Sequence, residues 1–172
     1  MAAEIIVVGT STGGLKAVQT LLSGLPANFP LPIVIVQHRG KVADDGLCEY
    51  LQELSNMPVA EPEDKEPLQP GHVYLAPRDY HLLIQNGGFA LSIDAPEAFA
   101  RPSIDVLFES AADEFQERAI GVILTGANRD GARGLAAIWI SRSPSTTWAP
   151  GAWQNCSLRT SAEQSASPMS RT

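Results

Sequence analysis

Three side chains that can together carry out nucleophilic catalysis each follow an apolar, strand-like run in this sequence: Ser11, His38 and Asp130. A serine hydroxyl becomes a good nucleophile when a neighbouring imidazole takes its proton, and a carboxylate fixes the tautomer of that imidazole and stabilises its charge. The pattern therefore predicts Ser11 as nucleophile, His38 as base and Asp130 as acid. The alternative for Asp130 is a helix N-cap, because a helical pattern follows it.

Ser11 lies in the turn Gly9-Thr10-Ser11-Thr12-Gly13-Gly14, where a short apolar run changes into a helical pattern. Such a turn either presents a nucleophile or binds an anion at the new helix N-terminus. The dinucleotide pattern G-x-G-x-x-G and a Walker lysine are both absent, so the anion site is the weaker alternative. The stretch also fits the G-x-S-x-G elbow of α/β-hydrolases, but the chain order Ser-His-Asp differs from theirs.

The sequence contains two further histidines, and neither is placed as well as His38. His72 precedes its expected strand and lies at the opposite end of the sheet. His81 opens an expected hairpin, where a histidine with satisfied hydrogen bonds is the simplest interpretation.

The elements that must position these residues follow from apolar periodicity. β-branched runs predict buried parallel strands, helical spacing of apolar residues predicts helices, and Asn86-Gly87-Gly88 predicts a hairpin turn. The expected strands are 4–8, 33–37, a short one within 70–77, and 119–124; the hairpin is 80–93, and the helices are 15–25, 43–56, 103–115 and 130–138. This order predicts an α/β fold with a doubly wound, mostly parallel sheet in a three-layer α/β/α arrangement. Its ligands are expected at the carboxyl ends of the strands.

Composition limits the class of protein. The chain has 172 residues, 44% of them hydrophobic, and a formal net charge of −7, which argues against nucleic acid as a partner. Its two cysteines form no disulfide framework, and no zinc-ligand spacing occurs. No apolar run reaches the length of a membrane span, and no secretory signal is evident. We expect a cytoplasmic protein without membrane insertion, metal or nucleotide cofactor.

Five segments, in order, resemble the catalytic domain of the bacterial chemotaxis protein-glutamate methylesterases, the CheB type. They are the Ser-Thr-Gly-Gly turn at 11–14, Gln-His at 37–38, "LAP" at 75–77 with His81, "RPSIDVLF" at 101–108, and "LTG" followed by "DGA" at 124–132. The resemblance covers about residues 4–138. It implies the roles already given to Ser11, His38 and Asp130.

The resemblance also implies roles that the residues alone do not. It makes the backbone N–H groups of Thr12 and Ala127 the oxyanion donors, and it places His81 and Arg101 on the substrate side of the site. The implied reaction removes methyl esters from glutamates on the cytoplasmic helices of chemoreceptors, with deamidation of glutamines as a second activity. Since the family's receiver domain is not in this sequence, the control that it exerts is expected to be either absent or supplied by a separate receiver protein.

The C-terminal segment differs in composition from the rest. Residues 1–138 are expected to form the catalytic domain, whereas residues 139–172 hold all three tryptophans and many serines without periodicity. Our hypothesis is that this segment, disordered or the product of an altered reading frame, does not replace the family's last elements. Two alternatives to the methylesterase are therefore an inactive receptor-binding module and an esterase for small molecules.

Overall fold

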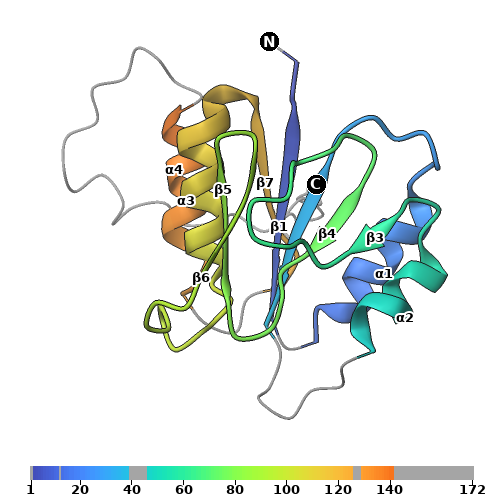
Figure 1. The fold of residues 1–172 in the computed structure, drawn as a ribbon, viewed down its shortest axis with the longest axis horizontal. Helices are drawn as coiled ribbons and strands as arrows, with labels where there is room; N and C mark the ends of the chain where they lie inside the picture. Colours follow the sequence, from blue (N-terminus) through green and yellow to red (C-terminus); the bar gives the residue numbers. More distant parts are fainter. Residues whose placement is uncertain (1, 12, 39–45, 126–128, 142–172) are drawn as a thin grey trace, which may run out of the picture.

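A parallel sheet of five strands organises the protein (Figure 1). The computed structural model describes residues 2–11, 13–38, 46–125 and 129–141. The strand order is β3-β4-β2-β1-β7, and every pairing is parallel. The strands are β1 (Ile5–Thr10), β2 (Ile33–Gln37), β3 (Val59–Ala60), β4 (Val73–Leu75) and β7 (Ala119–Ile123). The predicted parallel sheet is confirmed.

Four α-helices cover the two faces of the sheet (Figure 1). α1 (Leu15–Gly24) and α2 (Leu47–Leu54) lie on one face, and α3 (Ile104–Phe115) and α4 (Ala132–Ser141) lie on the other. A single 3-10 turn, η1 (Gln116–Arg118), joins α3 to β7. The strands of the sheet run downward in Figure 1, so their carboxyl ends meet at the lower end of the molecule.

A separate antiparallel hairpin packs beside α3 (Figure 1). It consists of β5 (His81–Gln85) and β6 (Gly88–Ser92), joined through Asn86 and Gly87, which both have positive φ (53° and 72°). That conformation is the reason for the Asn-Gly signal in the sequence. The hairpin is fixed to α3 by the hydrogen bond from the Ile84 N–H to the Ser110 hydroxyl (3.0 Å).

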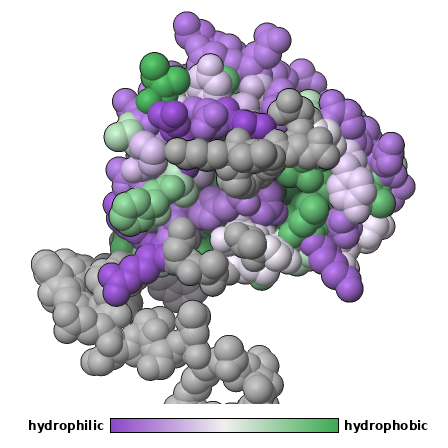
Figure 2. Space-filling view, turned by 90° about the horizontal axis from the view of Figure 1, so that it is seen from below, coloured by the Kyte–Doolittle hydropathy of each residue, from purple (hydrophilic) through white to green (hydrophobic). Residues whose placement is uncertain are grey.

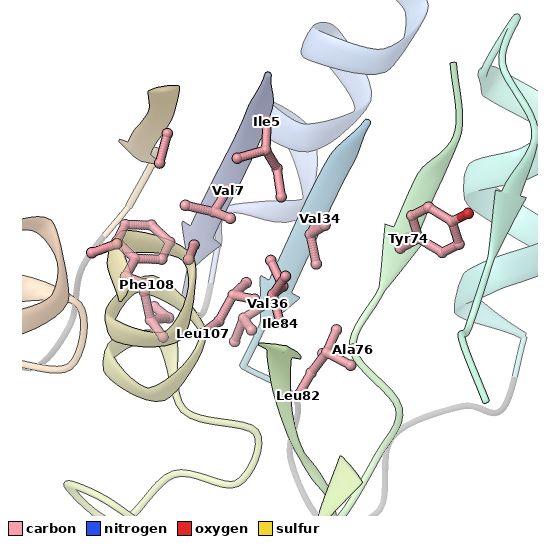
Figure 3. Packing of buried hydrophobic residues seen from close by; sticks show 14 of the residues in the cluster. Ile5, Val7, Val34, Val36, Tyr74, Ala76, Leu82, Ile84, Leu107 and Phe108 are labelled. Atoms are coloured by element: carbon pink, nitrogen blue, oxygen red, sulfur yellow. The ribbon is translucent and has the colours of Figure 1, made fainter. Parts of the chain in front are cut away.

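Two apolar clusters separate the layers, as alternating side chains on buried strands require. On the α3 side, Ile5 and Val7 of β1 and Val36 of β2 pack near Leu107 and Phe108 of α3 (Figure 3). On the α1 side, the other face of the same strands packs against both remaining helices. The two clusters hold β1 and β2 in the centre of the protein, which fixes where their last residues lie.

The structure differs from the sequence prediction at two points. The short strand β3 was not expected, because two residues carry no periodicity. α4 continues to Ser141, three residues into the segment 139–172 that the prediction assigned to the tail without helical pattern. Trp139 and Ile140 are helical but exposed, so they contribute little to an apolar stripe. Residues 142–172 lie outside the described part of the chain.

Candidate active site

Strand register brings Ser11 and His38 together. Thr10, the last residue of β1, is paired with Gln37, the last residue of β2. Ser11 and His38 follow these two residues, and the His38 N–H donates to the Thr10 carbonyl at 2.9 Å. Adjacent parallel strands therefore end side by side with the predicted nucleophile and base as neighbours.

The turn that carries Ser11 is fixed through its backbone. The Ser11 N–H donates to the Thr125 hydroxyl (3.1 Å), and the Ser11 carbonyl accepts from the Gln37 side-chain amide (3.1 Å) and from the Gly14 N–H (2.9 Å). Only 4% of Ser11 is exposed. Within the described residues, the hydrogen bonds of Ser11 all run through its backbone.

Gly14 is required by the close approach of two threonines. A Cβ at this position would lie 1.6 Å from the Thr10 hydroxyl oxygen and 2.4 Å from that of Thr125. These two hydroxyls also contact each other at 3.0 Å. Because Gly14 has no side chain, the turn leaves room for the Thr10 and Thr125 hydroxyls. The contact between these hydroxyls stabilises the backbone around Ser11.

His38 contacts the predicted acid directly. Its Nε2 lies 2.7 Å from Oδ2 of Asp130. An ionised carboxylate only accepts hydrogen bonds, so Nε2 carries the proton and Nδ1 of the neutral ring is the nitrogen with a free lone pair. In the standard triad the acid binds Nδ1 instead, so the ring nitrogen that faces the acid differs here.

Asp130 lies at the N-terminus of α3 with only 3% of its surface exposed. Besides His38, it accepts hydrogen bonds from three groups at the start of this helix: the Ser103 hydroxyl (2.7 Å), the Ile104 N–H (2.8 Å) and the Asp105 N–H (2.9 Å). Burial by itself would raise the pKa of Asp130, but hydrogen bonds from His38 and from these groups outweigh it, and the pKa lies below its ordinary value. Asp130 is therefore an anion at neutral pH.

The carboxylate of Asp105 accepts hydrogen bonds at the start of α4, as that of Asp130 does at the start of α3. Asp105 lies in the first turn of α3, yet its carboxylate accepts from the N–H groups of Gly131 (2.9 Å) and Gly134 (2.7 Å) at the start of α4. The two helices thus exchange capping carboxylates, since Asp130 precedes α4 and binds α3. The helix whose start Asp105 supports is therefore the neighbouring one.

The other predicted site residues fall into two groups. Thr12 and Ala127, the expected oxyanion donors, lie outside the described residues. His81 and Arg101 are described, and both make hydrogen bonds to backbone groups of the protein. Nδ1 of His81 accepts from the Ser103 N–H (3.2 Å), and its Nε2 lies 3.2 Å from the Ala95 carbonyl. Nη1 of Arg101 donates to two backbone carbonyls, at 2.9 and 3.0 Å.

The sequence prediction missed the residues that support the site. The Gln37 side chain donates to the carbonyls of both Ser11 and His38, so it links nucleophile and base through their backbones. Ser103 is the N-cap of α3, and its hydroxyl also binds Asp130. A sequence signal existed for Gln37 and Thr125, because Gln37 ends one predicted strand and Thr125 directly follows another.

No arrangement in the described part of the chain offers a metal site. Among these residues, no group of three or more His, Cys, Asp or Glu side chains is close enough to share an ion. The same part of the chain also contains no helix that is long and apolar enough to cross a membrane.

A parallel α/β sheet with Ser, His and Asp at its carboxyl edge defines a class of hydrolase-like proteins, and comparison with known proteins identifies the family. The family model described as CheB methylesterase matches residues 6–149. The chain belongs to the CheB methylesterase family, which confirms the resemblance and extends it beyond residue 138. The crystal structure of the Thermotoga maritima CheB methylesterase catalytic domain matches with a TM-score of 0.76 and 37% identity, over 83% of this chain and 77% of that one.

Named relatives agree with this assignment. A Leptospira interrogans protein that bears the name protein-glutamate methylesterase/protein-glutamine glutaminase is 50% identical over 136 residues, which is 78% of this chain and 70% of the relative. A Pseudomonas putida protein of the same name, from a group 3 operon, is 46% identical over 132 residues. That match spans 76% of this chain but 39% of the longer relative.

Proposed function

We propose that this protein hydrolyses methyl esters on glutamate side chains of other proteins and releases methanol. The observation that carries the proposal is the His38–Asp130 pair, 2.7 Å apart and fixed beside Ser11 by strand register. Its family membership and the names of its relatives support the choice of substrate.

The chemistry follows from the orientation of the imidazole. Ser11 Oγ attacks the ester carbonyl while His38 Nδ1 takes its proton, and the ionised Asp130 stabilises the imidazolium through Nε2. The tetrahedral intermediate collapses, and the leaving methoxide takes the proton from Nδ1 as methanol. Water then hydrolyses the glutamyl-serine ester by the same proton transfers, which restores Ser11 and yields the free carboxylate.

The negative charge on the intermediate needs hydrogen-bond donors. We assign these to the backbone N–H groups of Thr12 and Ala127, an assignment that the family resemblance supports. Removal of one donor of this kind typically raises the barrier by roughly 3–4 kcal/mol.

The protein substrates that we propose are the methylated cytoplasmic helices of chemoreceptors, so the place of action is the cytoplasm. The same serine can attack a glutamine side-chain amide and release ammonia, which accounts for the second activity in the relatives' name. The catalytic unit, on this proposal, runs to the end of α4, and the remaining C-terminal residues lie outside it.

A serine-directed fluorophosphonate probe tests whether the site is an active nucleophile. We expect the probe to modify Ser11, as peptide mass mapping would show, and to leave the exposed Ser23 unmodified. Asp130→Asn should slow the modification at least tenfold, because the base loses its partner. A folded protein that does not react with the probe would instead be the inactive receptor-binding module.

A further inference from the structure

The segment 93–101, which joins β6 to α3, carries an unusual tight turn at its tip. The backbones of Glu97 and Ala100 exchange two hydrogen bonds, of 3.1 and 2.8 Å. The two residues between them, Ala98 and Phe99, both have positive φ (47° and 67°). Glycine and asparagine are the usual residues in such a turn, and a bulky aromatic residue is a clear exception. Phe99 is nevertheless fully exposed, at 104%.

The base of the 93–101 loop is firmly held. Nη1 of Arg101 donates to the carbonyls of Ile93 (2.9 Å) and Asp94 (3.0 Å), which closes the loop on itself. Nε2 of the buried His81 donates to the Ala95 carbonyl at 3.2 Å, because its Nδ1 is already an acceptor. Both predicted substrate-side residues therefore position this loop, and the loop presents Phe99 at a defined place.

The loop lies beside the active site. Phe99 is four residues before Ser103, and an extended chain spans at most about 3.6 Å per residue, so their Cα atoms are within about 14 Å of each other. The Ser103 hydroxyl in turn binds Asp130. Oε2 of Glu97 lies 3.6 Å from Nη2 of Arg133, in the first turn of α4. This ion pair links the loop to the residues that follow Asp130. In Figure 1 the loop projects at the end of the molecule where the strands finish.

Two more exposed apolar side chains accompany Phe99. The hairpin pairs His81 with Ser92, so the next position in this register sets Tyr80 opposite Ile93. Tyr80 is 40% exposed and Ile93 74%. Seen from this end, the surface is mostly hydrophilic with separate hydrophobic patches (Figure 2). Phe99, Ile93 and Tyr80 are thus three exposed apolar side chains in and next to the loop.

We propose that the 93–101 loop docks the methyl-esterified protein substrate, with Phe99 packing between apolar side chains that flank the esterified glutamate on a helical surface. This inference rests on the proposed function. A protein that brings one of its glutamyl esters to Ser11 must cover the neighbouring loop. A single ester side chain offers few contacts, so affinity must come from the surface around it, where a central aromatic residue contributes most.

Binding can be tested without turnover in the Ser11→Ala protein, by titration with a methyl-esterified helical receptor fragment. Phe99→Gly removes the side chain while glycine suits the φ of 67°. We expect this change to raise Kd by about tenfold or more, as loss of a buried aromatic contact requires. Phe99→Tyr should stay within about threefold of the parent. Trp139→Ala, which removes another exposed aromatic residue (65%) far along α4, should leave Kd unchanged.

An unchanged Kd for Phe99→Gly would overturn the proposal. A change in the oligomeric state of Phe99→Gly without a change in its affinity for the fragment would also overturn it. The same fragment and a small nitrophenyl ester, offered to the protein with Ser11 intact, separate this proposal from the proposed function. Docking by Phe99 predicts that Phe99→Gly lowers kcat/KM for the fragment at least tenfold and leaves hydrolysis of the small ester within twofold. Failure of both substrates to react, with Kd still dependent on Phe99, would contradict the enzyme and uphold the docking surface.

Discussion

At the scale of single residues, the site depends on a carboxylate that is kept ionised inside the protein. Asp130 is buried, a condition that favours the neutral acid, yet donors from His38 and from the start of α3 hold its pKa below the ordinary value. The anion fixes the proton on Nε2 of His38. One buried residue thereby decides which imidazole nitrogen keeps a free lone pair.

The lowered pKa of Asp130 predicts how stability depends on pH. The carboxylate binds its proton more weakly in the folded than in the unfolded protein, so its stabilising contribution is complete above an unfolded-state pKa of about 3.9 and is lost as pH falls through the folded pKa. The free energy of unfolding of the wild type should therefore fall more steeply below about pH 5 than that of Asp130→Asn. Urea unfolding between pH 7 and pH 3 measures this. The prediction would be contradicted if the difference in free energy of unfolding between the wild type and Asp130→Asn stayed constant down to pH 3.

A second residue-scale prediction concerns Asp105. Asp105→Ala leaves two buried N–H groups of α4 without their acceptor, and it should lower the free energy of unfolding by about 2–4 kcal/mol. Asp105→Asn keeps an oxygen in place and should lose about 1 kcal/mol. Urea unfolding of both variants at pH 7 is the measurement. Equal losses in the two variants would show that the oxygen does not cap α4.

At the scale of elements, the site exists because two adjacent parallel strands end at the same level and a helix begins next to them. β1 ends before Ser11, β2 ends before His38, and α3 begins next to Asp130. Gly9 permits this last contact, since a Cβ there would lie 2.4 Å from Ile104. Backbone contacts therefore position the site: strand pairing places His38 beside Ser11, and N–H groups at the start of α3 bind Asp130.

The turn after β1 supplies a prediction with a matched control. Gly14→Ala places a methyl group against the Thr10 and Thr125 hydroxyls and should destabilise the protein by about 1–3 kcal/mol. Gly24→Ala, at the end of α1 with open space around it, should instead be neutral or stabilise by up to about 1 kcal/mol. Thermal melts of both variants provide the comparison. A tolerated Gly14→Ala would mean that the threonine contact does not define the turn.

Sequence reasoning predicted the central elements well because local periodicity encodes them. The strands that became β1, β2 and β7 and the capped start of α3 all have strong signals, and three of the predicted site residues follow from strand ends. Contacts between residues that are far apart in the sequence were not predictable in the same way. The exchange between Asp105 and α4, and the link from Gln37 to Ser11, join residues whose proximity depends on how the elements pack.

At the scale of the whole molecule, the two faces of the sheet serve different purposes. The α1 and α2 face is an apolar layer, whereas the α3, α4 and hairpin face carries the acid, its donors and the 93–101 loop (Figure 1). The proposed chemistry and the proposed docking surface thus share one layer. Variants on the α1 face should affect stability without changing substrate preference.

The C-terminal boundary is also a whole-molecule question. We proposed that residues beyond α4 lie outside the catalytic unit, since their composition lacks apolar periodicity. Limited trypsin digestion should then cut first at Arg142 and Arg159 and leave a protected fragment that ends near residue 142. Arg133 and Arg129, next to the acid, should resist cleavage. Protection of Arg159 as strong as that of Arg133 would contradict this boundary.

The central claim is that Ser11, activated by His38 and Asp130, hydrolyses glutamate methyl esters. The most direct test is methanol release from a methyl-esterified chemoreceptor fragment by the wild type and by Ser11→Ala, with thermal melts of both proteins. We predict methanol release by the wild type, a loss of at least a thousandfold in Ser11→Ala, and cooperative melts for both. Equal release by the two proteins, or none by a cooperatively folded wild type, would contradict the account.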